Sequence, residues 1–265
     1  MADTPTILVL DSGLGGLTVL REIAKARPDA RYVYVADDAF FPYGHLSEEE
    51  IIARVVPLVG ELIATHTPDI AVIACNTMSV SVLGPLRATY SVPFVGTVPA
   101  IKPACAASKT KRVSVLGTRA TVQREYTQAL IRDHARACTV TLVGAAHLAR
   151  LAEDALRGKP VSDADIVSEI APCFVPAADG GALRTDAVVL ACTHYPLLLD
   201  RLLRLAPWPV AWIDPAPAIA RRVVDLLGPG DSGGCELPPE MIFTSGRSRT
   251  LTDALAPFFG GRVPA

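Results

Sequence analysis

The sequence predicts an α/β protein of two pseudo-symmetric, doubly wound lobes with largely parallel sheets. The first reason is a repeated segment: residues 69–75 and 186–192 both read as an Asp, five apolar residues and a Cys. The second is that apolar runs alternate with helical patterns along the whole chain, which is typical of parallel strands joined by helices. The third is the separation of 117 residues between Cys75 and Cys192, which suits two halves of a duplicated α/β protein.

The first lobe is expected to open with the apolar strand 6–10, which ends in the glycine-rich turn Asp11-Ser-Gly-Leu-Gly-Gly16 and leads into a helical pattern. This turn does not fit the dinucleotide pattern G-x-G-x-x-G, but its backbone N–H groups can approach an anionic ligand. An ordinary tight turn with a surface Asp is the alternative. Ser47 is expected to cap a helix, with Glu50 in capping-box position. Further predicted elements are strands at 31–36, 69–74 and 93–98, and helices at 47–66 and from residue 77 through 86.

The pattern restarts near residue 110 and predicts a second lobe. Proline-marked crossovers are expected at 99–103 and 207–209. The predicted domains are therefore 1–98 plus 211–265 for a discontinuous first lobe and 99–210 for the second. Predicted elements are strands at 112–116, 140–143, 186–191, 210–213 and 241–243, helices through 126–130 and at 147–156, 160–174, 197–205, 218–227 and 251–259, and loops at 179–181 and 228–239.

Composition and charge exclude several classes of protein. The net charge is −2 and no basic block is present, so neither nucleic acid nor an anionic membrane is expected as a partner. No apolar run reaches the ~18 residues of a membrane span, and the N-terminus lacks the basic region of a signal peptide, so we expect a cytoplasmic protein. The six cysteines are scattered without a C-x-x-C pair, which favours free thiols over disulfides or a metal site.

Two of these cysteines stand where ligands bind in parallel α/β sheets. Cys75 and Cys192 each follow a predicted buried strand, and ligands bind at the carboxyl ends of such strands. A single Cys in this position is usually core packing. Here Cys75 precedes Asn76-Thr77 and Cys192 precedes Thr193-His194, and such polar pairs are not core sequence. We therefore expect both thiols to face one active site in the cleft between the lobes.

Two thiols on opposite sides of one cleft suit a particular chemistry. A free thiol titrates near ~8.5, and an imidazole or a helix N-terminus can move it toward neutrality. One group can then remove a proton from one face of a carbon while the other supplies a proton to the opposite face. The pattern therefore indicates stereochemical inversion by paired acid–base groups.

Several motifs closely resemble the glutamate racemases of the cofactor-independent aspartate/glutamate racemase superfamily. They occur in the same order over nearly the whole chain: Asp11-Ser-Gly-Leu-Gly-Gly16, Pro42-Tyr-Gly44, Ala74-Cys-Asn-Thr77, Gly96-Thr-Val-Pro-Ala-Ile-Lys102 and Ala191-Cys-Thr-His-Tyr-Pro196. The resemblance implies reversible conversion of L- and D-glutamate for peptidoglycan synthesis. It implies no metal and no cofactor, including PLP, and a homodimer is expected.

The resemblance also implies roles for individual residues. Cys75 and Cys192 would be the two bases, the first acting on the D-isomer and the second on the L-isomer. Asp11 would support Cys75, whereas His194 and Glu153 would support Cys192. The residues expected to contact substrate are Asp11, Ser12, Tyr43, Gly44, Asn76, Thr77, Thr193 and His194. The chain departs from the family pattern at Met78, Ala191, Asp214-Pro-Ala216 and in the segment before Glu153, and none of these changes removes a catalytic group.

Three other interpretations remain open from the sequence. A sister racemase could act on aspartate or hydantoins, since a few pocket contacts decide the length of the side chain that is accepted. A non-catalytic amino-acid-binding module could keep the fold without the chemistry. A Cys192/His194 hydrolase is the third, although residues i and i+2 at a strand end need not bring the imidazole to the thiol.

Overall fold

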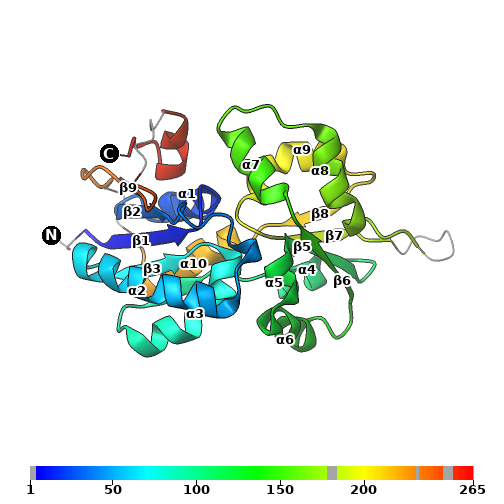
Figure 1. Ribbon diagram of the computed structural model, residues 1–265, viewed down its shortest axis with the longest axis horizontal. Coiled ribbons are helices and arrows are strands. Elements are labelled where there is room, and N and C mark those ends of the chain that lie inside the picture. Colours follow the sequence, from blue (N-terminus) through cyan, green and yellow to red (C-terminus); the bar gives the residue numbers. More distant parts are fainter. Residues whose placement is uncertain (1–3, 178–183, 231–232, 247–252, 265) are drawn as a thin grey trace. The chain divides into compact units, whose positions relative to one another are not determined.

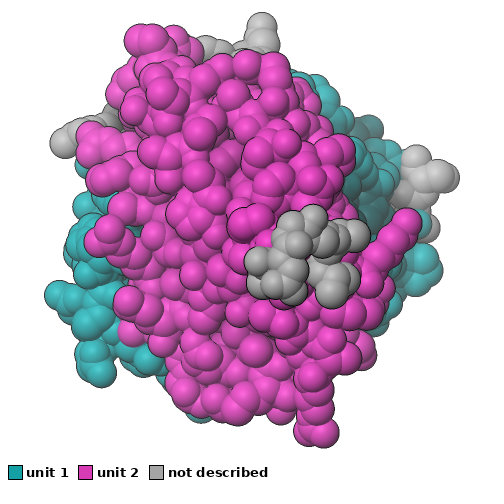
Figure 2. Space-filling model, turned by 90° about the vertical axis from the view of Figure 1, so that its right-hand side faces the viewer, with its two compact units in different colours: residues 1–97, 216–265 teal, residues 98–215 magenta. Residues whose placement is uncertain are grey.

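The computed structural model describes residues 4–177, 184–230, 233–246 and 253–264. The chain divides into two compact units, coloured separately in Figure 2. Unit 1 contains Met1–Thr97 and Ala216–Ala265, and unit 2 contains Val98–Pro215. Each unit has one sheet, and all strand pairings described in both sheets are parallel.

Unit 1 is a five-stranded sheet in the order β4-β3-β1-β2-β9. The inner strands β1 and β3 are buried along their whole length, as their continuous apolar sequences predict. Helix α1 packs on α10, and α2 lies beside α3 (Figure 1). The bounds in unit 1 are β1 Thr6–Asp11, α1 Leu17–Ala26, β2 Arg31–Ala36, η1 Tyr43–His45, α2 Glu48–His66, β3 Ile70–Ile73, α3 Asn76–Thr89, β4 Phe94–Gly96, α10 Ala216–Leu227, β9 Glu240–Phe243 and η4 Asp253–Phe259.

Unit 2 is a four-stranded sheet in the order β6-β5-β7-β8. Its inner strand β7 is buried throughout, and apolar side chains of helices α7 and α8 share one hydrophobic cluster with side chains of β5, β6 and β7 (Figure 1). The bounds in unit 2 are α4 Ile101–Ala107, β5 Arg112–Thr118, α5 Arg119–Gln123, α6 Glu125–His134, β6 Thr139–Ala145, α7 Leu148–Leu156, α8 Asp163–Ile170, η2 Ala171–Cys173, β7 Ala187–Ala191, η3 Tyr195–Leu198, α9 Leu199–Leu205 and β8 Ala211–Ile213.

Local signals that the sequence predicted are present at two helix starts in unit 1. The capping box of α2 is complete, because Glu50 N donates to Ser47 Oγ at 3.2 Å and Ser47 N donates to Glu50 Oε2 at 2.7 Å. Gly16, directly before α1, permits a close backbone approach. A Cβ there would lie 2.6 Å from Asp11 Cβ and 3.0 Å from Ala74 Cβ, so the turn after β1 needs glycine at this point.

The structure corrects the predicted course of the chain at the crossovers. Residues 99–103, expected as a crossover, lead into α4, because Pro103 lies in the first helical turn, where its missing N–H costs nothing. The segment 211–215, expected in the first lobe, belongs to unit 2, because β8 pairs with β7.

Four predicted helices are shorter or differently built. The helix through residues 126–130 is divided at Arg124, which has extended backbone between α5 and α6. The helix expected at 160–174 begins only after its N-cap Ser162 and ends in the 3₁₀ turn η2. A 3₁₀ turn, η3, precedes α9, and the described part of the helix expected at 251–259 is the 3₁₀ segment η4. The loop expected at 179–181 lies outside the described residues.

No helix in the described ranges combines the length and the apolar character that a membrane span requires.

Candidate active site

The residues expected around Cys75 gather at the carboxyl edge of the sheet in unit 1. Asp11 is the last residue of β1, and Cys75 follows β3 by two residues. Because β1 and β3 are hydrogen-bonded neighbours, with Leu10 opposite Ile73, their ends reach the same edge. Cys75 is also the N-cap of α3, so it stands at the positive end of a 14-residue helix.

The Cys75 thiol is almost fully buried beside a serine hydroxyl. Its Sγ lies 3.7 Å from Ser12 Oγ, and only 6% of Cys75 is exposed. Asp11 has no exposed surface, and its Oδ1 accepts a hydrogen bond of 2.9 Å from Gly13 N. The glycine-rich turn thus fixes Asp11 and presents Ser12 to the thiol.

The side chain of Asn76 is buried without a protein partner in the described part of the chain. Asn76 is 1% exposed, and neither its Oδ1 nor its Nδ2 makes a hydrogen bond there. A buried amide without partners costs about 1–3 kcal/mol, so such a group is rarely kept for packing alone. Thr77 follows in the first turn of α3 and is buried as well. These features suit a ligand with both donors and acceptors.

Tyr43 and Gly44, also expected at the site, lie in η1 and are held through Asp37. The Tyr43 hydroxyl donates to Asp37 Oδ2. Arg54 donates to both Asp37 oxygens, at 3.0 and 2.7 Å, and Thr244 Oγ1 donates to Oδ1 at 2.5 Å. Burial raises the pKa of Asp37, but these hydrogen bonds outweigh it and hold the pKa below its usual value. Burial and the Asp37 carboxylate raise the pKa of Tyr43, so its phenol stays neutral.

In unit 2 the structure brings Cys192, His194 and Glu153 together. Cys192 directly follows β7 and is 7% exposed. Its Sγ lies 3.9 Å from His194 Nδ1, and His194 Nε2 lies 3.0 Å from Glu153 Oε2. Glu153 comes from α7, 41 residues earlier in the chain. The imidazole therefore does reach the thiol, although only one residue separates them in sequence.

The direction of these hydrogen bonds follows from their chemistry. An ionised carboxylate only accepts, so His194 Nε2 must carry the proton that it shares with Glu153. In the neutral ring Nδ1 is then an acceptor and faces the Cys192 thiol. The arrangement can take a proton from Cys192 and return it. Thr193 lies between the two residues and is buried.

Two residues of this region were missed by sequence reasoning. Arg157 Nη2 forms an ion pair with Glu153 Oε1, and the spacing of four residues was the signal that could have revealed it. Tyr195 is fully buried beside the thiol, where burial and then Cys192 raise its pKa well above its usual value. Arg54 and Asp37 were missed in the same way in unit 1, although Asp37 directly follows β2.

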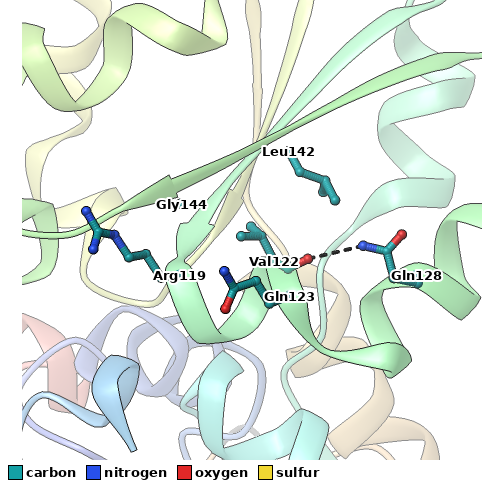
Figure 3. A pocket seen from close by; sticks show the side chains of 6 residues that line it. All are labelled: Arg119, Val122, Gln123, Gln128, Leu142 and Gly144. Atoms are coloured by element: carbon teal, nitrogen blue, oxygen red, sulfur yellow. Dashed lines mark hydrogen bonds between the residues drawn. The ribbon is translucent and has the colours of Figure 1, made fainter.

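A pocket of about 540 Å³ in unit 2 contains none of the expected site residues (Figure 3). Its lining is Arg119, Val122, Gln123, Gln128, Leu142 and Gly144. The Gln128 carboxamide donates to the carbonyl of Val122 at 3.3 Å, and the Arg119 side chain lies on the other side of Val122 (Figure 3). The pocket presents one guanidinium and two carboxamides but no acid–base pair. Among the residues with described positions, no group of three or more His, Cys, Asp and Glu is arranged to hold a metal.

Comparison with known proteins shows the family to which this chain is similar. The model of the Asp/Glu/Hydantoin racemase family matches residues 7–223. The chain is 59% identical to a glutamate racemase from Brucella anthropi over 224 residues, which cover 84% of this chain and 80% of the relative.

Solved structures agree over almost the full length. The chain is similar to Escherichia coli glutamate racemase in complex with L-glutamate and the activator UDP-MurNAc-ala, with a TM-score of 0.85, 36% identity and coverage of 98% of this chain and 96% of that one. It is also similar to glutamate racemase from Aquifex pyrophilus, with a TM-score of 0.73, 28% identity and coverage of 98% and 96%. The chain belongs to the Asp/Glu/hydantoin racemase family.

Proposed function

We propose that this chain interconverts L- and D-glutamate by exchanging the proton on Cα, without metal or organic cofactor. The observation that carries the proposal is that each unit presents one buried thiol at the carboxyl end of an inner strand, with its own polar partners. The 59% identity to the Brucella anthropi glutamate racemase supports glutamate as the substrate. The Escherichia coli relative, whose structure contains L-glutamate, supports the same choice.

The proposed chemistry uses the two thiols with opposite roles. From L-glutamate the Cys192 thiolate removes the α-proton, and the Cys75 thiol then delivers its own proton to the opposite face of the planar carbanion. From D-glutamate the roles are exchanged. One S–H bond forms as one C–H bond breaks, and the second thiol reverses this exchange, so nothing is oxidised or reduced. His194 accepts the proton of the Cys192 thiol through Nδ1 and generates its thiolate.

The remaining residues are proposed to bind the substrate and to stabilise the developing negative charge. The unpartnered amide of Asn76 and the N-terminus of α3 suit a carboxylate. Ser12, Thr77, Thr193, Tyr43 and Gly44 supply further hydroxyl and backbone donors. Such donors are most effective when they are already oriented, as the glycine-rich turn and the Asp37 cluster orient them.

The same proposal gives the protein a place in the cell. D-Glutamate made by such an enzyme would serve peptidoglycan synthesis in the cytoplasm, and the enzyme would act as a homodimer. Size-exclusion chromatography with light scattering measures the oligomeric state directly, and a monomer under assay conditions would contradict the dimer.

Turnover in deuterium oxide tests the reaction. Incubation with L-glutamate and no added cofactor should bring the optical rotation to zero, with deuterium in the Cα position of the product. Aspartate should turn over much more slowly, because a side chain shorter by one methylene changes the fit by about 1–3 kcal/mol. A requirement for PLP, retention of the α-proton, or faster turnover of aspartate or a hydantoin would contradict the proposal.

Separate cysteine variants test the two-thiol mechanism. Cys75→Ser and Cys192→Ser should each lower racemisation by about 10²–10⁴-fold, the usual contribution of an acid–base group. The Cys192→Ser variant should still exchange the α-proton of D-glutamate, and Cys75→Ser that of L-glutamate. Cys235→Ser, which changes a thiol far from both sites in sequence, serves as the control and should keep full activity. Identical preferences in the two variants would rule out bases of opposite handedness.

A thiol hydrolase is the second candidate, favoured by the 3.9 Å contact between Cys192 Sγ and His194 Nδ1. Such an enzyme forms a thioester at its cysteine. If the racemase proposal is correct, incubation with amides and unactivated esters should give no hydrolysis, and mass spectrometry should detect no acylated Cys192. Turnover of an amide or ester through an acyl intermediate would favour the hydrolase.

A further inference from the structure

Both carboxylate oxygens of Glu153 are engaged on different sides. Oε2 contacts His194 Nε2 at 3.0 Å, and Oε1 accepts a hydrogen bond from Arg157 Nη2. Cys192, His194, Glu153 and Arg157 therefore form one continuous chain of side chains, which we call the Cys192 relay. It ends at Arg157, a residue for which the proposed reaction has no direct use.

The outer part of this relay runs from two buried side chains to a partly exposed one. The side chain of His194 is 2% exposed, that of Glu153 is 4% exposed, and that of Arg157 is 34% exposed. The backbone also fixes Arg157, because its N–H donates to the Glu153 carbonyl at 3.1 Å at the end of α7. Arg157 thus brings a positive charge from the protein surface to a buried carboxylate.

This ion pair differs from an ordinary pair on a helix surface. Pairs four residues apart on exposed helices contribute only a few tenths of a kcal/mol. Here one partner is buried, and removing the other would leave a buried charge without compensation. The neighbouring pair of Asp154 and Lys159, at 2.7 Å, shows the ordinary case: Lys159 is mostly exposed, and the bond described for its ammonium group goes to Asp154, which is not part of the relay.

We propose that Arg157 is a positioning residue that fixes the Glu153 carboxylate and thereby the tautomer of His194. The guanidinium favours the ionised, acceptor-only form of Glu153. That form requires the proton on His194 Nε2, so the lone pair of Nδ1 faces Cys192. The inference rests on the proposed function only in giving Cys192 a role as a base.

Alkylation of Cys192 tests this inference without glutamate. Iodoacetamide reacts with the thiolate, and peptide mass spectrometry measures its rate at Cys192 and, as an internal reference, at Cys75. Arg157→Gln should slow alkylation of Cys192 about tenfold relative to Cys75, since a charge-assisted hydrogen bond is lost. Arg157→Lys, which keeps the charge, should restore most of the rate, and Lys159→Gln should leave it unchanged.

Two results of the alkylation experiment would overturn the role of Arg157. If Arg157→Gln and Lys159→Gln alkylate alike, Arg157 is only a surface partner of α7 and the inference is wrong. If Arg157→Gln alkylates faster, Arg157 restrains the relay instead of positioning it, and the inference is also wrong. Faster alkylation of Cys75 in the same variant would indicate general unfolding, because unfolding exposes this buried thiol. The comparison of Arg157→Lys with wild type would then decide whether the inference holds.

Isotope effects provide the matching test during turnover. The ratio of kcat/KM values for two enantiomers is fixed by their equilibrium constant, so slower chemistry at Cys192 cannot change it. Instead, in Arg157→Gln the deuterium isotope effect should increase with Cα-deuterated L-glutamate and decrease with the D-isomer, because proton transfer at Cys192 becomes limiting. Equal changes for both isomers would overturn the inference. Absence of any glutamate turnover in wild type would count against the proposed function, while the alkylation result would still decide the role of Arg157.

Discussion

The two thiols occupy equivalent places in similar sheets but are supported in different ways. Cys75 begins a regular α-helix, since Ser79 N donates to its carbonyl at 2.8 Å, four residues on. Cys192 begins a tighter turn, since Tyr195 N donates to its carbonyl at 3.1 Å, three residues on. The first thiol therefore has a helix N-terminus and a serine beside it, whereas the second has the Cys192 relay.

The residues after each cysteine explain this difference. Asn76-Thr77-Met78 continues into α3 without interruption. Thr193-His194-Tyr195 leads to Pro196, which lacks an N–H and lies in the short 3₁₀ turn η3. A turn of four residues has little dipole to offer a thiolate, and the imidazole of His194 lies beside the Cys192 thiol instead. Two copies of one strand motif thus place a thiol beside a helix N-terminus in one unit and beside side-chain partners in the other, and under the proposed mechanism both arrangements would activate a base.

Among the residues that support the two thiols, the largest effect is expected from the imidazole of the Cys192 relay. His194→Asn should lower racemisation about 10²–10³-fold, because the group that accepts the thiol proton is lost. Alkylation should slow at Cys192 and stay normal at Cys75. His134→Asn changes an exposed histidine at the end of α6 and is the matched control. If Cys75 loses reactivity to the same extent, the two halves are not independently supported.

The next effect concerns the stability of unit 1. Asp37→Asn leaves a single acceptor oxygen where Tyr43, Arg54 and Thr244 all donate, and should lower the free energy of unfolding by about 2–3 kcal/mol at pH 7. Urea denaturation measures this change. Alkylation of Cys192 should remain normal, because Asp37 belongs to the other unit.

The pH dependence of this loss follows from the lowered pKa of Asp37. A carboxyl group with a lowered pKa stabilises the fold fully above its unfolded value of about 3.9, and this stabilisation disappears as the pH falls through the folded pKa. The difference between wild type and Asp37→Asn should therefore be constant near neutrality and shrink below about pH 4. Glu125→Gln, which removes an exposed ion pair with Arg132, should change stability little at any pH. A difference that grows in acid would contradict this interpretation.

The smallest effect is expected from the partner of the Cys75 thiol. Ser12→Ala removes a weak contact of 3.7 Å and one proposed hydroxyl donor to the substrate, and should lower racemisation about tenfold, since the helix N-terminus and the other donors remain. Ser81→Ala, which removes a buried hydroxyl without a described partner in the same helix as Cys75, should leave activity unchanged. If Ser12→Ala lowered racemisation as much as His194→Asn, the two thiols would depend equally on side-chain partners, and the difference inferred between the two units would be wrong.

Much of the fold could be predicted because its signals are local. The buried strands β1, β3 and β7 are continuous apolar runs, and the capping box of α2 is visible in four residues. The prolines were less informative: Pro103 was expected to mark a crossover but lies in the first turn of α4, and the residues after Pro209 join the second sheet. Proline restricts the backbone at one position without deciding which sheet the following strand will join.

The sequence by itself determined where the two thiols stand, because strand ends and the polar residues that follow them are local properties of the chain. The motifs of the resemblance also pointed to Glu153 for the Cys192 side. Only the tertiary structure decided that Glu153 contacts His194 across 41 residues, that Arg157 closes the relay, and that Arg54 and Thr244 meet at Asp37. These contacts depend on how helices pack against sheets, and side-chain packing over long separations has no periodic signature in sequence.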